Sequence, residues 1–233
     1  MAQATFFVAI ALTITYRPYR TGKSMKSKQL LMILLLLFTM NTTAQETSIW
    51  QPIEGQHYVA LETTTVQNTA ATVQFYFWPG SASCYQFELA LQKWQWNHPR
   101  TEVKRIPLVK RPSWRLLSKA VLVAEELNLA DTFINQLYQA LHLQYQTISN
   151  HLELEQFLQS QNIDAVNFMT LFSSPLINQK LMSIEFSNNL LPLKGVPTII
   201  INGQWLTDAT MAKTSAQLLS VIDLLSAQSI EEE

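Results

Sequence analysis

Runs of apolar residues along the chain predict a sheet built from two separated parts. A nearly continuous β-branched and aromatic run at residues 71–78 is typical of a central strand buried on both faces. Asn202 and Gly203 form a hairpin signal between two further strands. Shorter runs predict the remaining strands, an alternating edge strand at 57–61 and others at 103–109, 198–201 and 204–206.

Helical spacing of apolar residues fills the rest of the pattern. Pro79 and Gly80 end the central strand, and Ser81 stands where a helix N-cap belongs. The amphipathic pattern continues from there through residues 88–96. Between residues 113 and 187 the signal is helical, and further helices are predicted at 132–143, 152–159, 164–186 and, after the later strands, at 212–227.

The order of these elements predicts an α/β fold. Strand–strand–helix–strand comes first, a block of helices follows, and strand–strand–helix closes the chain, so helices cover a mixed sheet in three layers. The expected organisation is a core formed by residues 45–110 and 188–233, with a helical domain inserted at 111–187.

The charge distribution sets residues 1–44 apart from the remainder. They hold five basic residues and no acid, whereas all 17 acidic residues lie in 45–233. Met25 begins a short basic segment, residues 30–40 form an apolar run, and Ala44 ends a stretch of small residues. This is the pattern of a secretory signal peptide with its start at Met25 and cleavage before Gln45, and residues 1–24 are then an upstream extension.

The alternative for this segment is an uncleaved anchor, although the apolar run is short for a membrane span. Cleavage would leave no stable membrane span and would place the mature chain in an oxidising compartment. A net charge of −1 gives no basic surface for nucleic acid. No cofactor or metal is expected, because the chain has one cysteine and its four histidines lack ligand spacing.

Several segments, in their order and spacing, resemble the DsbA family of bacterial periplasmic thiol:disulfide interchange proteins, which have a thioredoxin-like fold with an inserted helical domain. The resemblance covers nearly all of residues 45–233. It is carried by residues 55–61, 77–88 (FWPGSASCYQFE), 111–114 (RPSW), 195–198 (GVPT) and the hairpin signal. It implies a periplasmic location and a cis-proline loop at Val196 and Pro197.

The chain departs from the family at the active-site motif. The family carries Cys-Pro-His-Cys at this helix start, where this chain reads Ser81, Ala82, Ser83 and Cys84. Position 81 would hold the attacking cysteine, so only the resolving cysteine remains. The family's buried acid falls on Phe75, or on Gln74 with a one-residue shift, and neither is ionisable.

Disulfide exchange requires a thiolate, and a dithiol cycle requires two sulfurs in one site. Cys84 therefore has no internal partner. It is either a small buried apolar group, a slow monothiol that forms mixed disulfides with a partner, or a contact to a second chain or ligand. Ser81 is either a cap alone or also a hydrogen-bond donor to bound peptide. A hydrolase nucleophile is excluded, because no nucleophile-elbow motif surrounds Ser81.

The same resemblance makes Val196 and Pro197 candidate substrate-binding residues, because backbone pairing with an extended polypeptide needs no sulfur. An ordinary proline at the start of a strand is the simpler alternative. Three functions remain open. The first is a DsbA-like protein that binds unfolded polypeptides as a holdase, adaptor or regulator. The second is a monothiol oxidoreductase acting through Cys84, and the third is a structural role in the envelope.

Overall fold

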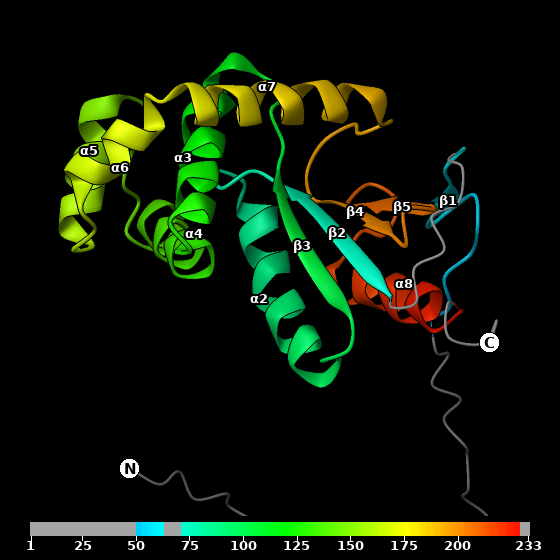
Figure 1. Cartoon of the computed structure of the whole chain (residues 1–233). Helices are drawn as coiled ribbons and strands as arrows, with labels where there is room; N and C mark the ends of the chain where they lie inside the picture. The colour runs from blue at the N-terminus through cyan, green and yellow to red at the C-terminus, as the bar shows by residue number, and fades with distance from the viewer. Residues whose placement is uncertain (1–49, 63–70, 229–233) are drawn as a thin grey trace, which may run out of the picture. The chain divides into compact units, whose positions relative to one another are not determined.

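A computed structural model describes residues 50–62 and 71–228, so the predicted signal peptide lies outside the described residues. The five strands are β1 (Val59–Ala60), β2 (Thr72–Phe77), β3 (Glu102–Pro107), β4 (Thr198–Ile201) and β5 (Trp205–Asp208). They form one sheet in the order β1-β5-β4-β2-β3 (Figure 1). Strand β2 is parallel to β3 and antiparallel to β4, so the predicted mixed sheet is confirmed.

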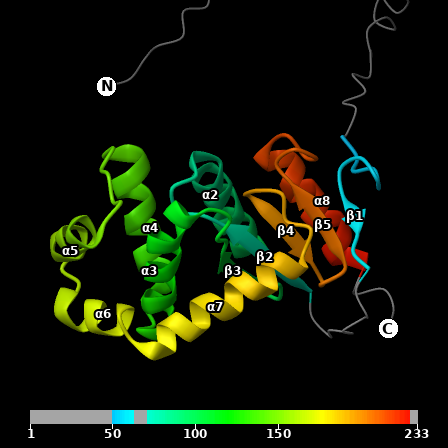
Figure 2. The same ribbon diagram turned by 90° about the horizontal axis from the view of Figure 1, so that it is seen from above.

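Helices cover both faces of this sheet, which confirms the three layers (Figure 2). Helices α2 (Ala82–Asn97) and α8 (Ser215–Gln228) pack on the face that carries Phe75 and Phe77. The opposite face carries a smaller cluster around Tyr76 and lies on the side of α7 (Pro175–Leu190). Strand β2 is buried along almost its whole length, as its apolar run predicts.

The remaining helices form a lobe beside the core (Figure 1). A 3-10 turn, η1 (Pro112–Trp114), begins the lobe. The helices that follow are α3 (Arg115–Glu126), α4 (Ala130–Tyr138), the π-helical turn η2 (Gln139–Leu143), α5 (His151–Ser160) and α6 (Ala165–Phe172). Within the described part of the chain, no helix is long and apolar enough to cross a membrane.

The prediction of a single helix over residues 164–186 is wrong. The chain forms α6 and α7 instead, with a break at Ser173 and Ser174. Ser174 caps the second helix by accepting a hydrogen bond from the backbone N–H of Ile177, and Pro175 occupies the first helical turn. Proline is well tolerated at a helix start but removes a donor inside a helix, so this Ser-Pro pair favours a new helix over continuation.

Candidate functional site

Strand pairing brings two loops to one end of the sheet. Tyr76 of β2 lies opposite Thr198 of β4 in an antiparallel register. The chain leaves β2 into residues 78–81 and enters β4 from residues 195–197, so both loops lie beyond this pair of residues. Thr198 Oγ1 donates to the Gly195 carbonyl at 2.7 Å and closes the second loop. The peptide bond between Val196 and Pro197 is cis, as the family resemblance implies.

Val196 offers backbone groups that the fold leaves open. In the part of the chain that the structure describes, its N–H and C=O take part in no hydrogen bond. Its side chain is half-buried against both apolar clusters. An extended segment that lies alongside could pair with these groups, because backbone donors and acceptors are strong hydrogen-bonding groups.

Ser81 caps helix α2. Its backbone is extended, and its hydroxyl accepts a hydrogen bond from the backbone N–H of Cys84 at 3.3 Å. The Ser81 N–H in turn donates to the Trp78 carbonyl at 3.0 Å, and the hydroxyls of Ser81 and Ser83 lie 2.9 Å apart. The predicted capping is therefore confirmed. The oxygen of Ser81 is satisfied within the loop, where the family has a reactive sulfur.

Cys84 lies in the apolar core, with no exposed surface. Burial raises the pKa of its thiol to about 11, against the smaller lowering effects of the Ser81 hydroxyl and the Trp78 backbone. A nearby acid, Glu88, also acts to raise this pKa. The thiolate is the reactive form of cysteine. The raised pKa makes this form scarce at neutral pH, and burial keeps reagents away from the sulfur.

We expect a thiol reagent to modify Cys84 only after the protein unfolds. At pH 8 the raised pKa alone makes the thiolate on the order of 100-fold scarcer in the folded chain than in the unfolded chain, and burial removes access in addition. Native labelling should rise only as the pH approaches 11. The measurement compares labelling rates in native and denaturing buffer, and rapid native labelling at neutral pH would contradict this assignment.

Two indole rings stack beside the loop. The Trp78 and Trp114 rings lie 4.7 Å apart at an angle of 5°. Trp78 also covers Gly80, where an added Cβ would lie 2.2 Å from the Trp78 ring. Glycine is thus required at position 80 by close packing. The stack joins the loop after β2 to the start of the helical lobe at η1.

His142 supports the same loop, a role that the spacing of the histidines in the sequence does not indicate. Its Nε2 lies 2.8 Å from the Pro79 carbonyl, and its ring stacks on Tyr85 with centroids 5.4 Å apart. His142 belongs to η2, and π-helical turns inside helices often occur at functional sites. Within the described residues, no His, Cys, Asp and Glu side chains gather into a metal-binding group.

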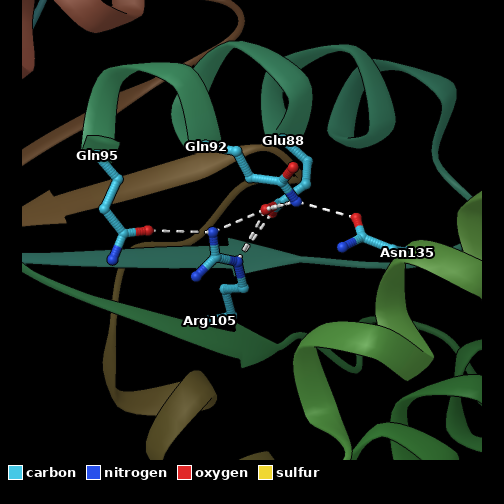
Figure 3. Close-up of polar contacts among 5 residues, drawn as sticks. All are labelled: Glu88, Gln92, Gln95, Arg105 and Asn135. Atoms are coloured by element: carbon cyan, nitrogen blue, oxygen red, sulfur yellow. Dashed lines mark hydrogen bonds and ion pairs between the residues drawn. The ribbon is translucent and has the colours of Figure 1, made fainter. Parts of the chain in front are cut away.

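A buried acid is present, but on the helix rather than on strand β2. Phe75 is fully buried in the core, and Gln74 accepts a hydrogen bond from the Tyr76 hydroxyl. Glu88 of α2 is 1% exposed and pairs with Arg105 of β3 at 2.8 Å (Figure 3). The guanidinium also donates through Nε to both carboxylate oxygens, at 2.9 and 3.1 Å. Glu88 ends the segment that resembles the family, but no periodicity argument distinguishes this glutamate from a surface one.

The fold and the loop geometry define a class: a thioredoxin-like core with an inserted helical lobe, and a Ser-Ala-Ser-Cys helix start at the same end of the sheet as a cis-proline loop. The family model of the DSBA-like thioredoxin domain matches residues 102–220, just over half of the chain. The chain therefore belongs to this family of thiol:disulfide interchange proteins.

Individual relatives agree with this assignment. The thiol:disulfide interchange protein DsbA of Azotobacter vinelandii is 25% identical over 195 residues, which is 82% of this chain and 91% of the relative. The Burkholderia cepacia DsbA is 25% identical over 210 residues, 86% of this chain and 97% of its own. The crystal structure of Pseudomonas aeruginosa DsbA has a TM-score of 0.69 at 23% identity and covers 76% of this chain and 94% of its own. At 23% identity this structural similarity shows that the two chains share a fold, and it does not by itself indicate function.

Proposed function

We propose that this chain is an exported, periplasmic DsbA-like protein that binds extended or unfolded polypeptides beside Val196 and Pro197 and has lost dithiol chemistry. The observation that carries the proposal is the pairing of a capping oxygen at Ser81 with a fully buried sulfur at Cys84. With one cysteine in the chain, a dithiol–disulfide cycle lacks its second thiol. Residues 25–44 supply the export signal in this proposal.

The binding edge is supported by the open backbone groups of Val196. Strand addition obtains affinity from main-chain hydrogen bonds and specificity from neighbouring side chains. The half-buried ring of Trp114 and the side chain of Val196 flank the same apolar cluster and supply the neighbouring apolar surface. Clients with extended, apolar segments fit this edge best, which is the chemistry of unfolded polypeptides.

A monothiol enzyme is the less favoured function. It would need Cys84 to attack a client disulfide, and that sulfur is buried and has a raised pKa. The labelling experiment on Cys84 separates the two functions, because a mixed-disulfide mechanism requires native reactivity.

Removal of the Val196 N–H should weaken client binding. We expect Val196→Pro to raise the Kd for a reduced, carboxymethylated, permanently unfolded client roughly five-fold, because one backbone hydrogen bond is worth about 1 kcal/mol. Fluorescence anisotropy of the labelled client measures the affinity. Thermal denaturation checks that the variant is folded.

Val166→Pro is the matched control. Val166 is 80% exposed in the first turn of α6, where a helix N–H has no intrahelical partner. This control should leave the affinity unchanged. Absence of saturable binding by the unmodified protein, or an equal loss in both folded variants, would remove the proposed binding edge.

A further inference from the structure

A hollow with several polar side chains in its lining lies along the second half of α2, away from Ser81. Its volume is about 630 Å³, and its walls come from α2, β3 and α4. The side chains that line it include three carboxamides, one indole and two charged groups: Gln92, Gln95, Asn135, Trp96, Arg105 and Asp131. Trp96 is 15 residues beyond Ser81 on the same helix, so the two sites are about 22 Å apart along its axis.

The carboxamides are held in fixed orientations (Figure 3). Gln92 Nε2 donates to Glu88 Oε1 and to Asn135 Oδ1, each at 2.9 Å. Arg105 Nη2 donates to Gln95 Oε1 at 3.4 Å. These contacts use the oxygens of Gln95 and Asn135 and the nitrogen of Gln92.

The side-chain groups that these contacts leave unused include both hydrogen-bond donors and acceptors. Gln95 and Asn135 each keep an amide NH₂ as a donor, and Gln92 keeps its carbonyl oxygen as an acceptor. Asp131, which is exposed, adds a carboxylate acceptor. A ligand that donates and accepts in alternation would match this arrangement.

The charge of the hollow disfavours an anion. The single cation, Arg105, is already paired with the buried carboxylate of Glu88. Asp131 then leaves the lining with an excess of negative charge. A carboxylate or phosphate ligand would compete with Glu88 for the guanidinium and be repelled by Asp131, so an anionic ligand is disfavoured.

Trp96 provides an uncovered aromatic face at the rim. It is 87% exposed, whereas large aromatic side chains usually bury most of their surface. The C–H groups on one face of a pyranose ring pack well on an indole, while the ring hydroxyls both donate and accept hydrogen bonds. Exposed tryptophan beside amide and carboxylate side chains therefore has the chemistry of a carbohydrate site.

We propose that this hollow binds a neutral saccharide, with one sugar ring stacked on Trp96 and its hydroxyls bonded to Gln92, Gln95, Asn135 and Asp131. The volume accommodates a ligand of a few rings at most. The site does not depend on the proposed polypeptide binding, since it uses no residue of the loops around Ser81 and Val196.

The test titrates the full mature chain with N-acetylglucosamine, triacetylchitotriose and maltotriose, followed by calorimetry and by tryptophan fluorescence. We expect saturable binding of at least one of these sugars. We also expect Trp96→Ala and Gln95→Leu each to weaken it about ten-fold or more, the equivalent of about 1.4 kcal/mol. Both side chains lie at the surface of α2, and thermal denaturation confirms that the variants are folded.

Tyr145→Ala is the matched control, because Tyr145 is 85% exposed, follows η2 and does not line the hollow. It should bind the sugar as the unmodified chain does. Three results would each overturn the saccharide site: no saturable binding of any of the three sugars, an equal loss in the control, or saturation by a neutral peptide but by no sugar.

Discussion

Ser81→Cys should convert this protein into a dithiol oxidoreductase, because it adds the second cysteine that the unmodified chain lacks. The new sulfur would lie at the N-terminus of α2, where Ser81 now accepts the Cys84 N–H. Backbone donors and the helix dipole lower the pKa of a cysteine at that position. The spacing of two intervening residues then allows a disulfide to Cys84. We expect measurable reductase and oxidase turnover in the variant and none in the unmodified chain.

Ser83→Cys provides the control for this change. It adds the same sulfur to the same exposed turn, but next to Cys84 in the chain. Adjacent Cα atoms are about 3.8 Å apart, below the usual disulfide range of about 4.4–6.8 Å. This variant should gain a thiol that a reagent can label in the folded protein, but it should form no internal disulfide. Catalysis of client oxidation by the unmodified chain, without an added thiol, would overturn the proposed loss of chemistry.

Activity gained by Ser81→Cys should be weaker than in the family's dithiol enzymes. Ala82 and Ser83 replace the family's central Pro-His dipeptide, and Phe75 and Gln74 supply no ionisable group under the site. The comparison of the variant with its further derivative Ala82→Pro/Ser83→His measures the contribution of that dipeptide to the turnover.

Arg105→Met should produce the largest loss of stability. The substitution leaves the Glu88 carboxylate 99% buried without its ionic partner, because the remaining Gln92 amide is neutral. Removal of one member of a buried ion pair costs about 3–5 kcal/mol. We expect a decrease of that size in the free energy of unfolding, measured by urea denaturation with Cys84 kept reduced.

Lys104→Met is the matched control, since Lys104 is the neighbouring strand residue and its pair with Glu102 is half-exposed on both sides. Exposed pairs contribute about 0–1 kcal/mol. The double variant Glu88→Leu/Arg105→Leu should recover most of the lost stability, because no unpaired charge remains buried. If Arg105→Met and Lys104→Met lowered the free energy of unfolding equally, the buried pair would not stabilise the fold more than an exposed pair does.

Local sequence signals were sufficient for the main elements of the fold. The apolar run of β2, the Pro79-Gly80 stop and the Ser81 cap all act within a few residues, and these three predictions agree with the structure. The Asn202–Gly203 hairpin was also predicted, and both residues have positive φ, 54° and 68°, as that turn requires. The family motif then located the candidate site at the start of α2 and at Pro197.

The contacts that support the site depend on residues far apart in the chain. His142 reaches Pro79 across 63 positions, and Arg105 reaches Glu88 from another layer of the fold. Periodicity cannot reveal such pairs, because Glu88 occupies a position that suits a solvated face equally well. The break at Ser174 was missed for a different reason, since apolar residues continue at helical spacing across the Ser-Pro pair.

The complete burial of the sole cysteine has a consequence for how a client would leave this protein. A complex held at Val196 contains no covalent bond, so its lifetime depends on the dissociation rate alone. Such a carrier needs no recycling partner to regenerate it after each round. Its behaviour would be the same at any redox poise of the surrounding compartment, unlike that of relatives whose cysteines must be reoxidised.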